Sequence, residues 1–347
     1  MCCSQINNNV VIALDAMGGD FAPLSVIQGA SFFLGNLIDP SIKVFFRIYG
    51  NQREISPLLL KYKNVSNNSE FTHCSDNVLA NDKPSFALRY RKDSSMKAAI
   101  EAVKDCKASG MVSSGNTGAL MAISRFVLGT LPNIYRPAIV SVCPTKTKSI
   151  ILLDLGANVD CNADVLFQFA LMGSVFAKIA LNVEDPEIAL LNIGTEEVKG
   201  SDSVRGAFEL LKTAPSINFK GYIEASEFLE GNVDVIVADG FVGNVMLKTA
   251  EATASALINL VKHEIFSSWT AKMLIGIILP KSKVDKALMR FNPQIRSGAM
   301  FLGLNGIVIK SHGNSDSISF AHAIKFAVNI ISENLNQKIV SEVSHLE

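Results

Sequence analysis

The chain has 347 residues, of which 48% are apolar by type, and it carries 32 basic and 32 acidic side chains. A chain of this length and apolar content can bury one large core. Because its charges balance, the composition excludes the broad basic surface that is typical of nucleic-acid binding, and we expect no nucleic-acid partner. Any anionic ligand must then be held by a local site.

Residues 1–9 contain neither the basic region nor the apolar stretch of a signal peptide, which predicts a cytoplasmic protein. The six cysteines are scattered and include no Cys-x-x-Cys pair. This spacing argues against zinc ribbons and redox motifs, so we expect reduced thiols. No cluster of His, Cys or Asp has metal-ligand spacing, and we therefore expect no metal site.

Short apolar runs that end in glycine-bearing polar loops recur along the chain, and helix-period segments lie between most of them. This alternation predicts an α/β fold of parallel strands joined by crossover helices. Because ligands bind outside the carboxyl ends of strands in open α/β sheets, we expect several of the loops after these strands to build the site. The expected strands cover residues 10–14, 110–113, 150–153, 188–193, 233–238 and 307–309.

No tandem repeat and no Pro/Gly/Ser-rich linker divides the chain, so we expect one domain over residues 1–347. A helical excursion at about residues 251–291 interrupts the strand-and-loop pattern, and Pro280 predicts a turn within it. The excursion contains an apolar patch with nearby lysines at residues 270–288. We expect this patch either to pack in the core or a dimer interface, or to bind a membrane surface reversibly.

Asp15, Gly18 and Gly19 belong to the loop that follows the first expected strand. The loop has neither the Gly-x-Gly-x-x-Gly spacing of a dinucleotide site nor the Gly-Lys-Ser/Thr ending of a P-loop, so nicotinamide and ATP are not indicated. Its carboxylates can orient a substrate or hold a basic group, and simple turn formation is the alternative.

A basic segment at residues 83–97 supplies Arg89 and Lys97 as candidates for anion binding, and a solvated surface is the alternative. Lys199 and His312 are further candidates, because each lies beside a glycine in a strand-end loop. For an isolated histidine, a structural role is the alternative.

Ser114, Gly115, Asn116 and Thr117 follow the second expected strand and precede apolar residues at helical spacing. Asn116 or Thr117 can cap this helix. The free N–H groups and the positive dipole end of a helix attract anions, and glycine permits close approach. The loop therefore predicts an anion site, with a tight strand-to-helix turn as the alternative.

Taken in order, these loops resemble the phosphate acyltransferases of fatty acid and phospholipid synthesis, nearly from end to end. The resemblance implies a three-layer α/β/α fold with a mostly parallel sheet, like that of isopropylmalate dehydrogenases and phosphotransacetylases, in a homodimer without a cofactor. Residues 1–9 and 297–300 depart from the family pattern. The segments that carry the resemblance include 13–20 (ALDAMGGD), 92–96 (KDSSM), 112–120 (VSSGNTGAL), 153–158 (LDLGAN), 190–196 (LLNIGTE), 239–244 (DGFVGN) and 312–313 (HG).

The same resemblance implies that acyl carrier protein and inorganic phosphate are the partners, and that acyl phosphate forms near the inner face of the membrane. A membrane glycerol-3-phosphate acyltransferase would receive the product. Residues 114–118 would hold phosphate, a cation would offset its charge, and an amide would stabilise the oxyanion. The candidate cations are Arg89, Lys97 and Lys199, and the candidate amides are Asn116, Asn158 and Asn244. The candidate catalytic residues are Lys199, Asn244 and His312, and Gly194 is a further candidate for substrate binding.

Three alternatives stay open. A short-chain phosphotransacetylase that uses coenzyme A differs only in thiol carrier and acyl length, which local motifs do not distinguish. An NAD-dependent decarboxylating dehydrogenase would share the fold but needs metal-binding aspartates and a nucleotide loop that the sequence lacks. A non-catalytic binding protein is the third. The sequence specifies neither the preferred acyl length nor a general base.

Overall fold

The computed structural model describes residues 9–39, 41–266 and 298–344, and the side chains of residues 261–266 are not described. One sheet of eleven strands runs through this part of the chain, in the order β3-β2-β1-β4-β11-β10-β5-β6-β9-β7-β8. The strands are β1 (Asn9–Asp15), β2 (Lys43–Gly50), β3 (Ser69–His73), β4 (Gly110–Ser113), β5 (Ala138–Pro144), β6 (Ser149–Leu153), β7 (Glu187–Asn192), β8 (Asn218–Glu224), β9 (Val235–Val237), β10 (Ala299–Leu302) and β11 (Ile307–Lys310).

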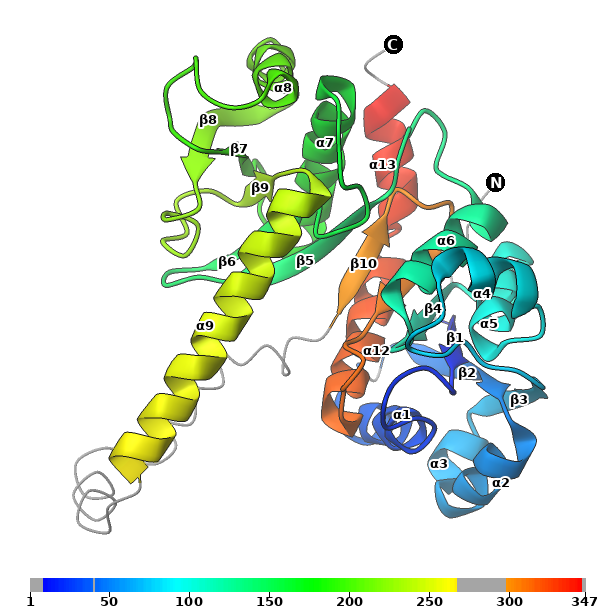
Figure 1. Cartoon of the computed structure of the whole chain (residues 1–347). Helices are drawn as coiled ribbons and strands as arrows, with labels where there is room; N and C mark the ends of the chain where they lie inside the picture. The colour runs from blue at the N-terminus through cyan, green and yellow to red at the C-terminus, as the bar shows by residue number, and fades with distance from the viewer. Residues whose placement is uncertain (1–8, 40, 267–297, 345–347) are drawn as a thin grey trace.

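Helices cover both faces of this sheet (Figure 1). They are α1 (Leu24–Asn36), α2 (Gln52–Lys61), α3 (Lys63–Ser66), α4 (Pro84–Tyr90), α5 (Ser95–Lys104), α6 (Thr117–Leu128), α7 (Ala163–Ala180), α8 (Asp202–Lys212), α9 (Gly240–Phe266), α12 (Ser317–Ser332) and α13 (Leu335–Ser344).

Two buried hydrophobic clusters lie on the two faces of the sheet. Strand side chains alternate between faces, so Ile12 and Leu14 of β1 join the cluster formed with α1, α7, α12 and α13, whereas Ala13 joins the cluster formed with α4, α5 and α6. Because both faces are covered, the central strands are apolar throughout. The expected three-layer α/β/α fold with a mostly parallel sheet is confirmed.

The strands fall into two parallel sets that run in opposite directions. In the first strand set, β3, β2, β1, β4 and β11 are parallel, and in the second strand set, β6, β9, β7 and β8 are parallel. The direction is inverted because β10 pairs antiparallel with both β11 and β5, and β5 pairs antiparallel with β6. The loops after β1, β4 and β11 therefore lie at one end of the strands, and those after β6, β7 and β9 lie at the other end.

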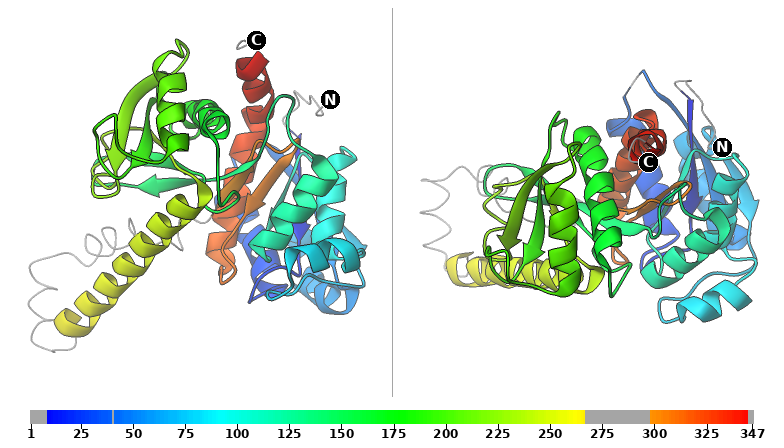
Figure 2. Two further views of the ribbon diagram at one scale, coloured as in Figure 1. Left: turned by 45° about the horizontal axis from the view of Figure 1, so that its top comes forward. Right: turned by 90° about the horizontal axis from the view of Figure 1, so that it is seen from above.

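Helix α9 is the described part of the expected excursion, and it begins at Gly240, earlier than predicted. It crosses in front of β6, and its carboxyl-terminal part projects away from the sheet (Figures 1 and 2). The expected turn at Pro280 and the patch at residues 270–288 lie outside the described residues. The structure therefore tests only the first part of this expectation.

Helix α7 is long and apolar enough to cross a membrane, but 61% of it is buried inside the protein, as in the core helix of a globular domain. Burial raises the pKa of the free thiols Cys74, to about 11, and Cys161, to about 12. Cys106 is disulfide-bonded, so the expectation of reduced thiols throughout is wrong at this position.

Candidate active site

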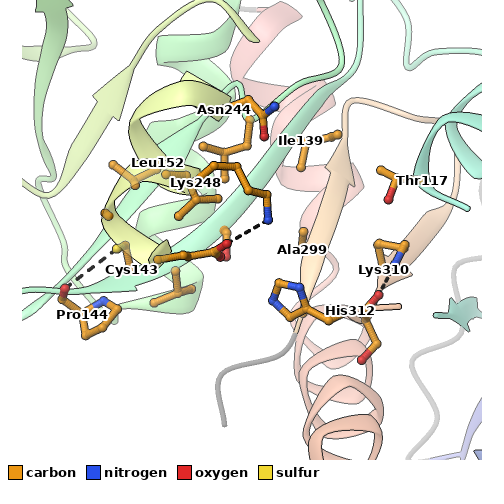
Figure 3. Close-up of a pocket in the computed structure, with 18 of the residues that line it drawn as sticks. Thr117, Ile139, Cys143, Pro144, Leu152, Asn244, Lys248, Ala299, Lys310 and His312 are labelled. Atoms are coloured by element: carbon orange, nitrogen blue, oxygen red, sulfur yellow. Dashed lines mark hydrogen bonds and ion pairs between the residues drawn. The ribbon is translucent and has the colours of Figure 1, made fainter. Parts of the chain in front are cut away.

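A cleft of about 400 Å³ separates the loop edge of the first strand set from α9. Its floor is formed by side chains of β5, β6 and β10, among them Ile139, Leu152 and Ala299. Figure 3 shows Thr117, Lys310 and His312 on one side of the cleft, and Asn244 and Lys248 of α9 on the other.

Asp15, at the end of β1, organises the first side of the cleft although it is only 1% exposed. Its carboxylate accepts hydrogen bonds from the hydroxyls of Ser95 and Ser113, each at 2.6 Å. The Ser113 hydroxyl in turn accepts a hydrogen bond from the Gly115 N–H at 3.0 Å. Burial raises the pKa of Asp15, while the serine donors lower it. The carboxylate thus joins β1, α5 and the loop after β4.

The loop after β1 packs so closely on the loop after β4 that glycine is required. A Cβ on Gly18 would lie 2.8 Å from the backbone nitrogen of Gly115, and Gly19 has a positive φ of 104°. The Ser114 hydroxyl donates to the Gly18 carbonyl oxygen at 2.7 Å. The close packing of these two loops therefore fixes the position of the α6 amino terminus. The residues that form this packing are Gly18, Gly19, Ser114 and Gly115.

Lys310, at the end of β11, is the buried cation of the cleft. It is 8% exposed, and its ammonium donates to the carbonyl oxygens of Ser114, at 3.4 Å, and Ser311. Burial lowers the pKa of Lys310 to about 8, and the charge of Asp15 partly offsets this effect. Because main-chain carbonyl oxygens carry no net charge, they do not neutralise the ammonium. Its desolvated positive charge is therefore suited to an anionic ligand.

Helix α6 begins at this cation. Asn116 is its N-cap and accepts a hydrogen bond from the Ala119 N–H at 3.0 Å. The Asn116 amide also donates to the carbonyl oxygens of Ala80 and Asp82, each at 2.9 Å. Its donors are thus committed to the 80–82 loop, whereas Thr117 lines the cleft. The first-turn N–H groups and the helix dipole add to the positive potential near Lys310.

Helix α9 brings Asn244 and Lys248 to the second side of the cleft. Its first turn packs on the loop after β6, where a Cβ on Gly243 would collide with the Asp154 carbonyl oxygen. Lys248 forms an ion pair with Glu251 at 2.8 Å. Asn244, Lys248 and His312 line the same cleft, with His312 on the opposite side from α9 (Figure 3). Burial lowers the pKa of the His312 imidazole, while the charge of Glu251 raises it. The net lowering favours a neutral imidazole at pH 7.

Asp154 occupies the corresponding place in the second strand set, but its partners differ. Its carboxylate accepts hydrogen bonds from the N–H groups of Ile139, Ala157 and Asn158 at 2.9, 3.0 and 2.7 Å, and from the Asn158 amide at 2.9 Å. The Asn158 amide also donates to the Pro137 carbonyl oxygen at 2.8 Å. Asn158 therefore holds its own loop, with both amide donors already used.

Comparisons with known proteins identify the family of this chain. The family model described as "Fatty acid synthesis protein" matches residues 10–338. The phosphate acyltransferase of Wolbachia pipientis wMel is 83% identical over 344 residues, which cover 99% of both chains. That of Ehrlichia canis (strain Jake) is 57% identical over 96% of this chain and 99% of its own. This chain belongs to the phosphate acyltransferase family. It is accordingly an acyltransferase, and an enzyme of fatty acid and lipid synthesis.

Solved structures share the fold of this family member at low sequence identity. A phosphotransacetylase from Streptococcus pyogenes superposes with a TM-score of 0.62 at 16% identity, over 94% of both chains. A branched-chain phosphotransacylase from Enterococcus faecalis V583 gives 0.55 at 14% identity, over 92% of this chain and 98% of its own. These matches confirm the expected resemblance to the phosphotransacetylase fold.

The structure places several of the predicted cations outside the cleft lining. Arg89, in α4, is exposed, and Lys97, in α5, forms an ion pair with Glu101 at 3.4 Å. Lys199 is exposed and lies with Gly194 in the loop after β7, in the second strand set. Their assignment to phosphate stays a prediction, because the lysines that line the cleft in the described part of the chain are Lys248 and Lys310.

Sequence reasoning missed Lys310 and Lys248. Lys310 has a usable signal, because a lysine at the end of an apolar strand, two residues before His312, is placed where it can be buried with the strand. Lys248 lies one helical turn after Asn244, so the spacing places both on one face of α9. Asn244 and His312, which the sequence predicts, do line the cleft with them.

Proposed function

We propose that the cleft transfers a fatty acyl group from the thioester of acyl carrier protein to inorganic phosphate, yielding acyl phosphate and the free thiol. The observation that carries this proposal is the buried ammonium of Lys310 beside the amino terminus of α6. A phosphate dianion that enters here gains a desolvated cation and helix N–H donors together.

The reaction needs few further groups. A phosphate oxygen attacks the thioester carbon, the tetrahedral oxyanion collapses, the C–S bond breaks, and the thiolate takes a proton from solvent. Fixing phosphate beside the thioester removes much of the entropic barrier. The amide of Asn244 and the ammonium of Lys248 face the cleft and are positioned to stabilise the oxyanion, an effect worth about 3 kcal/mol per well-placed donor.

His312 is proposed to accept a proton from the phosphate monoanion. Its pKa is lowered, chiefly by burial, so the imidazole is neutral when the monoanion and dianion coexist near pH 7. This role agrees with the position of His312 between Lys310 and the α9 residues Lys248 and Glu251.

The direct test uses hexadecanoyl-acyl carrier protein and labelled phosphate, with acyl phosphate trapped as its hydroxamate. We expect phosphate-dependent product from the wild-type chain and at least a tenfold lower kcat/KM with hexadecanoyl-coenzyme A. Equal use of both carriers would favour the coenzyme A alternative. Product from neither carrier would contradict the proposed function.

We further propose that the protein works as a cytoplasmic homodimer that hands its product to a membrane glycerol-3-phosphate acyltransferase. Exposed apolar side chains on the projecting helix α9, such as Leu260 at 59% exposure, support a partner for that helix. Sedimentation of the purified chain tests the dimer. Flotation with anionic liposomes tests the membrane contact predicted for residues 270–288, and a wholly unbound protein would contradict it.

A further inference from the structure

A second hollow, the apolar groove, runs along the other flank of α9. It has a volume of about 1170 Å³ and lies between α9 and the loops after β7, β8 and β9. Its lining includes Leu191, Val204 and Ala238 from the body, and Met246 and Ile258 from the helix. A concave apolar surface of this size is typical of a site for a large lipophilic ligand.

The apolar groove and the cleft share four lining residues, so they adjoin beneath α9. These are Phe228 and Leu229 on the body, and Ala250 and Ala254 on the helix. The two alanines are four residues apart and therefore lie on one face of α9. Because an alanine side chain is a single methyl group, larger side chains at these two positions would occupy space between the helix and Phe228.

The two hollows differ in charge. The cleft is lined by Lys248, Lys310 and His312, and Glu251 is the acid that pairs with Lys248 there, whereas the charged residues that line the apolar groove in the described part of the chain are the acids Glu224 and Asp239. An anion is thus favoured in the cleft and disfavoured in the groove. An amphipathic substrate whose polar end reacts in the cleft would place its apolar end in the groove.

We propose that the acyl chain of the substrate extends from the cleft, beneath α9 between Ala250 or Ala254 and Phe228, into the apolar groove. The inference rests on the proposed function and adds the subsite that receives the fatty tail. From Asn244 to Ile258 the helix rises about 21 Å, which is comparable to the length of an extended long-chain acyl group. Each buried methylene strengthens binding by up to about fourfold.

The test narrows the passage and compares acyl lengths. Ala254→Phe should lower kcat/KM for hexadecanoyl-acyl carrier protein at least tenfold more than kcat/KM for butanoyl-acyl carrier protein, because only the long chain must pass Phe228. The matched control is Ala256→Phe, two residues along the same helix at an exposed position. It should leave both substrates at wild-type rates.

A second variant keeps the test valid if Ala254→Phe does not fold. Thr253→Trp fills the groove from an exposed helix position, and it should discriminate against the hexadecanoyl substrate in the same way. Equal losses on both substrates, or no loss, would overturn the proposal. Equal losses accompanied by a lower sedimentation mass would instead identify the groove as a surface between two copies of the chain.

The outcomes also separate this inference from the proposed function. If the wild-type chain makes no acyl phosphate from either substrate, the function fails. If it does so and both narrowing variants keep the wild-type ratio of rates on the two chain lengths, the function stands and the apolar groove is not the acyl subsite.

Discussion

Asp15 and Asp154 are two buried carboxylates at strand ends in the two opposed strand sets, and they are used differently. Asp15 is held by two serine hydroxyls and the Met17 N–H and lies near Lys310, whereas Asp154 is held by three backbone N–H groups and an amide. The fixed donors around Asp154 lock a loop that anchors α9. The hydroxyls around Asp15 can rotate, and its neighbour is a cation that faces the cleft. The carboxylate of the second strand set therefore fixes a loop, whereas the carboxylate of the first strand set lies beside a cation that can bind an anion.

The largest expected effect separates the cations of the two strand sets. Lys310→Met should lower kcat/KM for phosphate about 10²–10³-fold, the loss typical of removing one strong electrostatic donor, while Lys199→Met should change it less than about threefold. Steady-state kinetics with varied phosphate measure both. A loss of phosphate use in Lys199→Met, with none in Lys310→Met, would assign the phosphate cation to the second strand set, where one of the three candidate cations lies.

The next effect concerns the two carboxylates. Asp154→Asn should lower the free energy of unfolding by about 3 kcal/mol, because its new NH₂ group would face donors that cannot turn. Asp15→Asn should cost only about 1 kcal/mol, since the hydroxyls of Ser95 and Ser113 can reverse their direction and the new amide oxygen can still accept from the Met17 N–H. Urea unfolding of both variants checks this order. Equal losses would mean that the two carboxylates are held with equal rigidity.

The third effect is a pH dependence of phosphate affinity, which should come from the cleft alone. Lys310 loses its proton near pH 8, so affinity for the phosphate dianion should fall by about tenfold per pH unit above that value. Lys310→Arg keeps its charge and should remove the fall. The variant provides the control, because a decline that persists in it would come from another group.

The titration of Lys310 should change phosphate affinity and the free energy of unfolding in opposite directions, so the loss of affinity cannot come from unfolding. The folded-state pKa of Lys310, about 8, lies below its ordinary value of 10.5, so the unfolded chain binds more protons between these pH values. The contribution of Lys310 to the free energy of unfolding therefore rises across this window while phosphate affinity falls. The difference in unfolding free energy between wild type and Lys310→Met, measured against pH, should show the rise.

The smallest effect compares helix caps in the two halves. Asn162 caps α7 by accepting a hydrogen bond from the Val165 N–H at 3.0 Å, and Asn162→Ala should cost about 1 kcal/mol of stability. Asn116→Ala should cost more, because the Asn116 amide also holds the 80–82 loop. Thermal unfolding monitored by circular dichroism measures both. An equal cost would show that those loop contacts contribute nothing to stability.

The sequence predicts the layers well because strand and helix periodicity are local properties. The junctions at Asp15, Ser114 and Lys310 fall at strand ends as expected. The opposed direction of the two strand sets could not be predicted, since it depends on β10, whose pairing with β5 joins residues far apart in the chain. That inversion explains why Lys199 does not share an edge with Ser114.

The candidate site was predictable where a motif surrounds the residue, as at Thr117, Asn244 and His312, all of which line the cleft. It was not predictable where function depends on burial. Asn158 and Lys310 both follow apolar strands, and only the folded structure shows that the amide is satisfied internally while the ammonium meets carbonyl oxygens.

The placement of β10 and β11 has a consequence for how the enzyme is made. These strands lie between β4 and β5 in the sheet, although they follow α9 in the chain. During synthesis, a chain released as far as α9 has the second strand set and strands β1 to β4 of the first, but neither β10 nor β11, and it exposes the unpaired edges of β4 and β5. Since β11 also contains Lys310, the cleft cation becomes available only when the strand that completes the sheet has been synthesised. Prematurely terminated chains should therefore aggregate rather than accumulate as partly active enzyme.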